Sequence, residues 1–157
     1  MDVAVIGATG AVGREVCIQL IERGILPPSS RLQLVGRSGG RSAPATHGFR
    51  ADLLDAYDEV APMIDVALDP SEVVADVIVF AAGATAPPRP GAEADRDALA
   101  SANAAVFASY ARSLAEFGSG REVVIMVTNP VGLGVATFAQ VLDRHQVIGM
   151  GAWLDTL

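Results

Sequence analysis

Short runs of β-branched and aliphatic residues alternate along the chain with longer segments in which apolar residues recur at helical spacing. In 11–23, for example, Val12, Val16 and Leu20 lie four residues apart. These patterns predict strands at 2–6, 32–35, 64–68, 76–82, 122–128 and 146–149, helices at 11–23, 51–60, 97–117 and 132–142, a helical turn at 70–74, and loops at 36–47 and 84–95. Strands that alternate with crossover helices indicate a parallel sheet covered on both faces. We therefore expect a doubly wound α/β fold that forms a single domain over residues 1–157.

The composition is that of a globular chain and argues against several other classes. Hydrophobic residues make up 51% and charged residues 18% of the 157 residues, whereas disordered chains are poor in apolar residues. The apolar stretches end far short of the roughly 20 residues that a membrane span needs. The single cysteine, Cys17, forms neither an internal disulfide nor a cysteine cluster for zinc, and no basic leader precedes the first apolar run. We expect no metal site, no membrane partner and a cytoplasmic location.

The charged residues bear on the partners of the protein. The net charge is −7, which argues against nucleic acid as a partner. All 11 basic residues are arginines. Each arginine near a site is therefore a planar, fork-shaped donor that suits phosphate or carboxylate groups.

A glycine-rich loop directly follows the first predicted strand and opens the first predicted helix. Its residues are Gly7, Ala8, Thr9, Gly10, Ala11, Val12 and Gly13. Glycines permit a tight turn and a close backbone approach, and a helix N-terminus offers unpaired N–H groups to a pyrophosphate. The alternative is a glycine-rich turn that binds no ligand. In this strand–loop–helix context, the loop predicts a dinucleotide site on a Rossmann-type parallel sheet.

The stretch 3–42 is similar to the start of two families, the semialdehyde dehydrogenases and the malate/lactate dehydrogenases. The later motifs resemble the malate/lactate dehydrogenases: Ala81-Ala82-Gly83 with Arg89-Pro90-Gly91, Arg96 and Asn103; Val127-Thr128-Asn129-Pro130-Val131; and Val147-Ile148-Gly149-Met150-Gly151 with Leu154-Asp155-Thr156. A semialdehyde dehydrogenase needs a catalytic cysteine well after the glycine loop. Cys17 lies inside the first predicted helix, where a small buried residue is the simpler interpretation. The resemblance therefore favours the malate/lactate dehydrogenases.

This resemblance implies a hydride transfer between a nicotinamide cofactor and a 2-hydroxy/2-oxo acid such as malate or oxaloacetate. It places Arg96 at the arginine that polarises the substrate carbonyl, and Asp155 at the aspartate that orients a catalytic histidine. Asn129 would contact the substrate and the nicotinamide, and Arg89 would grip a second substrate carboxylate. The remaining positions that it assigns to the cofactor are Ala82, Gly83, Asn103 and Val127.

Simpler interpretations exist for these polar residues. Arg96 fits a solvated helix start, Asn129 a strand-end cap, Asn103 an exposed helix position and Asp155 a solvated carboxylate. The segment between Gly83 and Asn103 is also longer than the family's usual form, so Pro88 competes with Arg89 for the carboxylate-binding position. Arg89 at that position favours malate over lactate, and Pro88 at that position would remove this preference.

The family's carboxylate-clamping arginine and catalytic histidine would lie beyond residue 157, in a substrate domain. We expect the two histidines that are present, His47 and His145, to be solvated. The chain would then bind a dinucleotide without dehydrogenase activity of its own, and the full-length enzyme would be a homo-oligomer.

The end of the second predicted strand indicates which nicotinamide cofactor is preferred. NAD sites place Asp or Glu there, where it binds the ribose 2′-hydroxyl. This chain has Gly36 instead, followed by Arg37, Ser38 and Arg41. An acid would repel a 2′-phosphate, whereas these residues leave room and supply donors. The sequence predicts NADP over NAD, and the alternative is an exposed polar turn.

Two other functions remain open at this point. One is a stand-alone nucleotide-binding or redox-sensing module without catalysis. The other is a semialdehyde-type dehydrogenase domain, which would require a reactive cysteine beyond the end of this chain.

Overall fold

Parallel strands form the centre of the structure, a computed structural model that describes residues 1–84 and 96–151. The strands are β1 Val3–Ile6, β2 Arg31–Val35, β3 Met63–Ala67, β4 Val77–Phe80, β5 Val123–Met126 and β6 Val147–Gly149. They are hydrogen-bonded in the order β3-β2-β1-β4-β5-β6, and every pair is parallel. The chain thus builds one half of the sheet outward from β1, then crosses back to β4 and builds the other half. This is the Rossmann order, and the doubly wound α/β prediction is confirmed.

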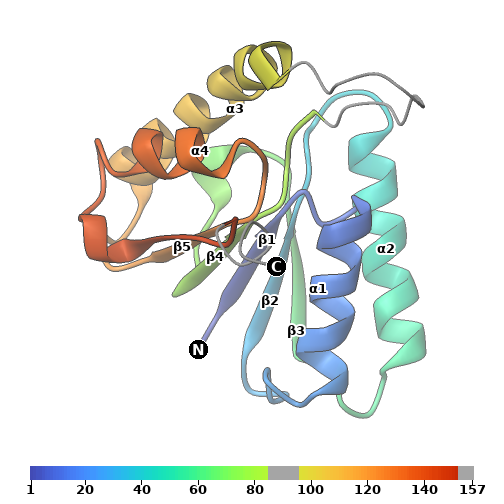
Figure 1. Cartoon of the computed structure of the whole chain (residues 1–157). Coiled ribbons are helices and arrows are strands. Elements are labelled where there is room, and N and C mark those ends of the chain that lie inside the picture. The colour runs from blue at the N-terminus through green and yellow to red at the C-terminus, as the bar shows by residue number, and fades with distance from the viewer. Residues whose placement is uncertain (85–95, 152–157) are drawn as a thin grey trace.

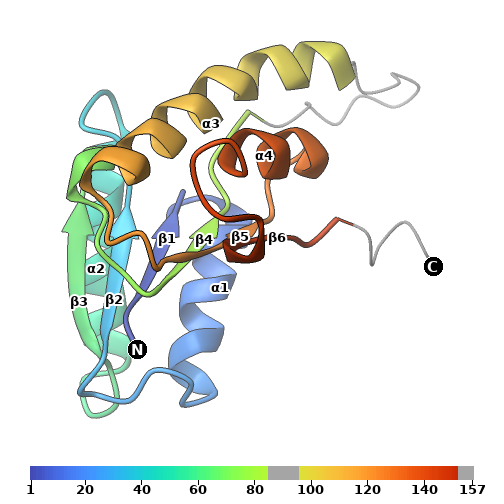
Figure 2. The ribbon, with the colours of Figure 1, turned by 90° about the vertical axis from the view of Figure 1, so that its left-hand side faces the viewer.

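Helices cover both faces of this sheet (Figures 1 and 2). Helices α1 Ala11–Glu22 and α2 Ser42–Ala56 lie on one face. Helices α3 Arg96–Phe117 and α4 Val131–Phe138 lie on the other. Two short 3-10 turns, η1 Pro70–Glu72 and η2 Arg144–Gln146, precede β4 and β6. In the described part of the chain, no helix has both the length and the apolar character of a membrane span.

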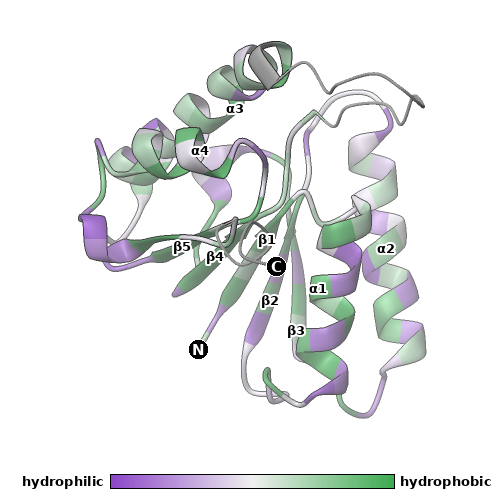
Figure 3. Cartoon of the chain, in the orientation of Figure 1, coloured by the Kyte–Doolittle hydropathy of each residue, from purple (hydrophilic) through white to green (hydrophobic). Residues whose placement is uncertain are grey.

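The alternation of side chains along each strand divides the core into two layers. Val3 and Val5 of β1 pack with the α1 and α2 side of the core, whereas Ala4 and Ile6 pack with the α3 and α4 side. Both sets are buried, and β1 is accordingly a continuous apolar run. Figure 3 shows β1 as hydrophobic, whereas α1 and α2 carry both hydrophobic and hydrophilic positions.

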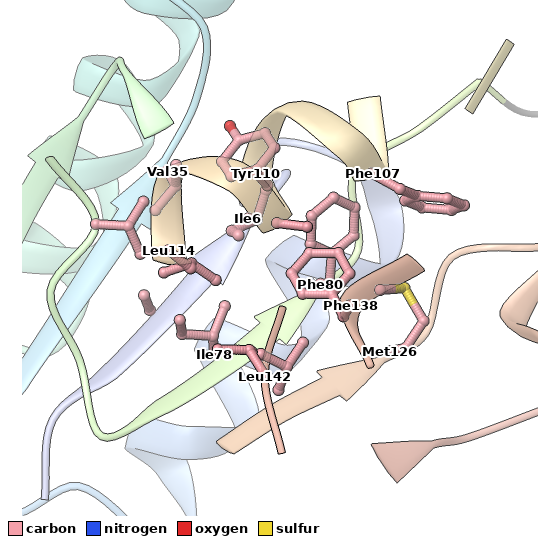
Figure 4. Close-up of a cluster of buried hydrophobic side chains, with 14 of the residues drawn as sticks. Ile6, Val35, Ile78, Phe80, Phe107, Tyr110, Leu114, Met126, Phe138 and Leu142 are labelled. Carbon is pink, nitrogen blue, oxygen red and sulfur yellow. The ribbon is translucent and has the colours of Figure 1, made fainter. Parts of the chain in front are cut away.

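Phe80, the last residue of β4, is the centre of an aromatic cluster (Figure 4). Its ring makes edge contacts with Phe107 and Tyr110 of α3 and with Phe138 of α4, at centroid distances of 5.5, 5.3 and 5.4 Å. Such pairs contribute about 0.5–1.5 kcal/mol each beyond the burial of area. The cluster packs both helices against the end of β4.

The sequence-based prediction for α2 was wrong at both ends. The loop expected at 36–47 ends at Arg41, because the helix begins at Ser42, and the helix expected to reach residue 60 ends at Ala56. Pro44 is compatible with this start because the first-turn amides of a helix have no intrahelical partner. Thr46 is buried against the end of β2. This tertiary contact holds the first turns of α2, and it leaves no periodic pattern of apolar residues in the sequence.

Candidate functional site

The glycine loop joins β1 to α1 at the point where the order of the sheet reverses. Gly7 has φ +83°, and its N–H donates to the Val35 carbonyl oxygen at 2.9 Å. A Cβ added at Gly7 would lie 2.8 Å from the backbone of Ala82, and one at Gly13 would lie 2.2 Å from the Gly7 oxygen. Both positions therefore require glycine, because the loop is pressed between the ends of β1 and β4 and the first turn of α1.

The N-terminus of α1 opens at this loop without a side-chain cap. Gly10 is the N-cap residue, it is exposed, and the first turn carries no acidic residue. Arg14 Nε donates to the Thr9 carbonyl oxygen at 3.3 Å, and its guanidinium stacks on Phe49 at 4.3 Å. The first-turn amides are thus left to solvent or to an anionic ligand.

The end of β2 forms a second wall of the site. Gly36 is buried and donates its N–H to the Ala67 oxygen at 2.9 Å. A Cβ there would lie 2.3 Å from Oγ1 of Thr46, so α2 packs too closely for any larger residue. The backbone N–H of Arg37 donates to Ser42 Oγ at 2.9 Å, while the side chain of Arg37 is exposed.

Asn103 connects the segments that follow β4 and β5. Its side chain is fully buried, its Oδ1 accepts from the Ala84 N–H at 2.7 Å, and its Nδ2 donates to the carbonyl oxygens of Ala84 and Asn129 at 3.3 and 2.7 Å. Thr128 adds a further link, because its hydroxyl donates to the Ala82 oxygen at 2.9 Å. The interpretation of Asn103 as an exposed helix residue is therefore wrong.

These segments enclose a cavity of about 470 Å³. The structure brings together at this cavity the predicted residues Gly7, Thr9, Gly10, Gly36, Arg37, Ala82, Gly83 and Asn103. Sequence reasoning missed Val35, Ser42, Ala81, Ala84, Ala102, Val106 and Tyr110, which also line it. Val106 and Tyr110 lie three and seven residues after Asn103, so the helical repeat was the signal that could have found them.

Other predicted residues lie elsewhere. Ala8 and Gly13 are buried beneath the loop, Val127 is half-buried, and Ala11, Val12, Ser38, Arg41 and Asn129 are exposed without lining the cavity. Arg96 is the first residue of α3, and its side chain lies outside the described part. Arg89 and Asp155 lie outside the described residues. His47 on α2 and His145 on η2 are exposed, as expected, and neither lines the cavity.

The residues present fit a dinucleotide. An uncapped helix N-terminus suits a diphosphate, and the mostly apolar floor between β1 and β4 suits flat rings. Arg37 supplies positive charge at the end of β2. The Rossmann sheet and this loop define a dinucleotide-binding domain at the topological switch point.

Comparisons with known proteins agree with this class. The family model described as lactate/malate dehydrogenase, NAD binding domain, matches residues 1–149. The chain therefore belongs to the lactate/malate dehydrogenase family, and the matched part is its NAD binding domain.

The individual proteins that this chain resembles are named as malate or 2-hydroxycarboxylate dehydrogenases. The L-2-hydroxycarboxylate dehydrogenase (NAD(P)(+)) of Methanocaldococcus jannaschii is 30% identical over 166 residues, covering 100% of this chain and 49% of that protein. The malate dehydrogenase of Methanothermobacter marburgensis is 33% identical over 164 residues, covering 100% and 47%. The solved malate dehydrogenase from Aeropyrum pernix matches with a TM-score of 0.76 at 25% identity, covering 96% of this chain and 46% of that one. The chain thus spans about half the length of the curated relatives it matches.

Proposed function

We propose that this chain is the cofactor-binding part of a dehydrogenase that transfers a hydride between NADP(H) and a 2-hydroxy/2-oxo acid such as malate or oxaloacetate. The observation that carries the proposal is the uncapped N-terminus of α1 at the switch point, which opens into the same cavity as the ends of β2 and β4. The names of the relatives support the class of reaction, since they are malate and 2-hydroxycarboxylate dehydrogenases.

The nicotinamide, when bound, supplies or accepts the hydride. The chain's own residues would bind and orient the cofactor and the substrate. The first-turn amides of α1 would hold the diphosphate, and Asn129, held through its backbone by Asn103, would present its side chain to the substrate side. We assign Arg96 to polarise the substrate carbonyl, Arg89 to grip a second carboxylate, and Asp155 to orient a histidine.

The preference for NADP rests on Gly36 and Arg37. An NAD site needs an acid at the end of β2, and the contact of Gly36 with Thr46 leaves no space for one. Arg37 follows directly and is exposed beside the cavity. A guanidinium pairs well with a 2′-phosphate, which carries about −1.5 to −2 charges by analogy with other phosphomonoesters.

Titration calorimetry with NADPH and NADH tests this preference. We expect NADPH to bind at least about tenfold more tightly, and Arg37→Ala to weaken NADPH by about ten- to a hundredfold while NADH changes little, because one charge-assisted hydrogen bond contributes roughly 1.5–3 kcal/mol. Arg23→Ala is the control, since Arg23 lies at the opposite end of α1 and bonds to Gln19. Equal affinities of the parent chain for both cofactors would contradict the preference.

One observation favours a binding module as the second candidate for the 157-residue chain taken alone. Neither His47 nor His145 lies at the cavity, so no described histidine is placed to move the substrate proton. We expect this polypeptide to bind cofactor without turnover. Oxidation of NADPH in the presence of oxaloacetate, followed by absorbance, checks this, and ready turnover would refute it.

Location and assembly follow from the same proposal. Cys17 is a buried free thiol, which is compatible with a reducing cytoplasm. We propose a homo-oligomer for the full-length enzyme, which size-exclusion chromatography of that enzyme tests.

A further inference from the structure

Tyr110 is a largely buried residue whose hydroxyl is not used by the fold itself. The residue is 6% exposed, and its ring stands edge-on to Phe80 at 5.3 Å and 90°. Figure 4 shows its hydroxyl pointing away from Phe80 and Phe138. Within the described residues, the hydroxyl makes no hydrogen bond. Arg31 Nε and Glu122 Oε2 are the described side-chain atoms that are both fully buried and without a hydrogen-bond partner, so the Tyr110 hydroxyl oxygen keeps contact with open space, where solvent or a ligand can meet it.

Tyr110 lies at the wall of the cofactor cavity. Tyr110 lines that cavity together with Val106, one turn earlier on α3, and with Val35, Gly36 and Arg37 at the end of β2. Val35 and Val106 offer apolar contacts for a flat ring. The Tyr110 hydroxyl is the polar group that α3 adds next to Val106. Apolar walls with one placed donor are what fixes the orientation of a small ring in a pocket.

We propose that Tyr110 recognises the purine base of the cofactor, with its hydroxyl donating a hydrogen bond to a ring nitrogen of adenine. This inference rests on the proposed cofactor function and adds a residue to it. It makes Tyr110 a binding residue for the adenosine end, and its contribution is the same for NADP and NAD.

The charges around Tyr110 favour the base over the 2′-phosphate as its partner. Burial and, to a smaller extent, the negative charge of Asp69 together raise the pKa of the Tyr110 hydroxyl to about 12, against the opposing effect of Arg37. The hydroxyl is therefore a neutral donor at ordinary pH, in a field that disfavours a dianion beside it. The donors suited to a phosphate, Arg37 and Ser42, belong instead to the connection between β2 and α2.

Tyr110→Phe removes only this hydroxyl and tests the proposal. We expect the variant to bind NADP+, NAD+ and 5′-AMP about five- to tenfold more weakly than the parent, by the same factor for all three, as loss of one hydrogen bond predicts. Nicotinamide mononucleotide, which lacks adenosine, should bind both forms equally. Tyr57→Phe is the matched control, because the Tyr57 hydroxyl contacts Glu22 at 2.8 Å on the α1 and α2 side. Thermal melting of each variant verifies that it is folded.

The outcomes separate this inference from the function on which it rests. If the parent binds NADP+ and Tyr110→Phe binds all ligands as the parent does, the role of Tyr110 is refuted while the cofactor site stands. If only NADP+ weakens and NAD+ and 5′-AMP do not, the hydroxyl serves the phosphate and the proposal is also refuted. If the parent binds none of the three, both the proposed function and this inference fail.

Discussion

Asn103 shows how one side chain organises the site from within the fold. Its amide bonds to the backbone at Ala84, after β4, and at Asn129, after β5, so it joins two segments that follow different strands. The sequence resemblance assigns it a cofactor contact, which stays a prediction. The structure adds a positioning role, because the buried amide holds Ala84 and Asn129 in place.

Replacement of Asn103 by alanine should destabilise the fold and the site together. The Ala84 N–H and the Asn129 carbonyl oxygen would lose their partners, so we expect the free energy of unfolding to fall by about 2–3 kcal/mol. Urea denaturation measures this. Ser101→Ala, at an exposed position of the same helix, should stay within about 0.5 kcal/mol of the parent. An Asn103→Ala midpoint equal to that of the parent would show that the three hydrogen bonds contribute little.

At the scale of elements, α1 performs two separate tasks. Its buried face, with Cys17 and Ile21, packs against the sheet, and its uncapped N-terminus opens into the cofactor cavity. The packing depends on apolar contacts and the binding on free amides, so substitutions can change one without the other.

Gly10→Asp separates these two tasks. Aspartate is a favourable N-cap residue, and Gly10 has φ −72°, which any residue adopts, so the free energy of unfolding should stay equal or rise by up to about 1 kcal/mol. The same carboxylate would bond to the amides and repel a diphosphate, so we expect NADPH affinity to fall by about a hundredfold or more. Parallel urea denaturation and titration calorimetry check this. Retained affinity would place the diphosphate elsewhere.

The buried face of α1 gives a pH prediction. Burial raises the pKa of the Cys17 thiol to about 12 from 9.0, so the thiol stays protonated in the native state where it ionises in the unfolded chain. Because the folded pKa is the higher one, its contribution to stability is complete below about pH 9 and is lost as the pH rises toward 12. Between about pH 8 and pH 10, the parent should lose about 1.4 kcal/mol more than Cys17→Ala in urea unfolding. Identical losses would mean that the thiol is accessible, as a reactive cysteine would be.

The start of helix α2 could not be predicted from the sequence pattern, whereas the buried strands could. Strands such as β1 and β4 were predictable because unbroken apolar runs mark buried parallel strands. The start of α2 was not, because Ala43, Pro44 and Ala45 carry no apolar period, and the residue that anchors this turn is Thr46, buried under Gly36. That contact joins residues from two elements, and no local pattern encodes it.

At the scale of the whole molecule, the order of the strands creates the site. The chain builds outward from β1 in both directions, so the loops after β1 and β4 part at the switch point and leave a cavity between them. The glycine loop could be predicted because its spacing and its strand–helix context are local. Tyr110 could not, since a tyrosine at helical spacing is usually a core residue, and only the assembled fold shows that it lines the cavity and turns its hydroxyl away from Phe80.

Amide NMR of the 157-residue chain titrated with NADP+ shows whether this cavity binds a nicotinamide dinucleotide. Gly7, Gly10, Gly36 and Gly83 line the cavity, whereas Gly24 and Gly120 lie in turns outside it. Binding in the cavity predicts large, saturable shifts for the first four glycines and none for the other two. Absence of saturable shifts at the four, or larger shifts at Gly24 and Gly120, would contradict it.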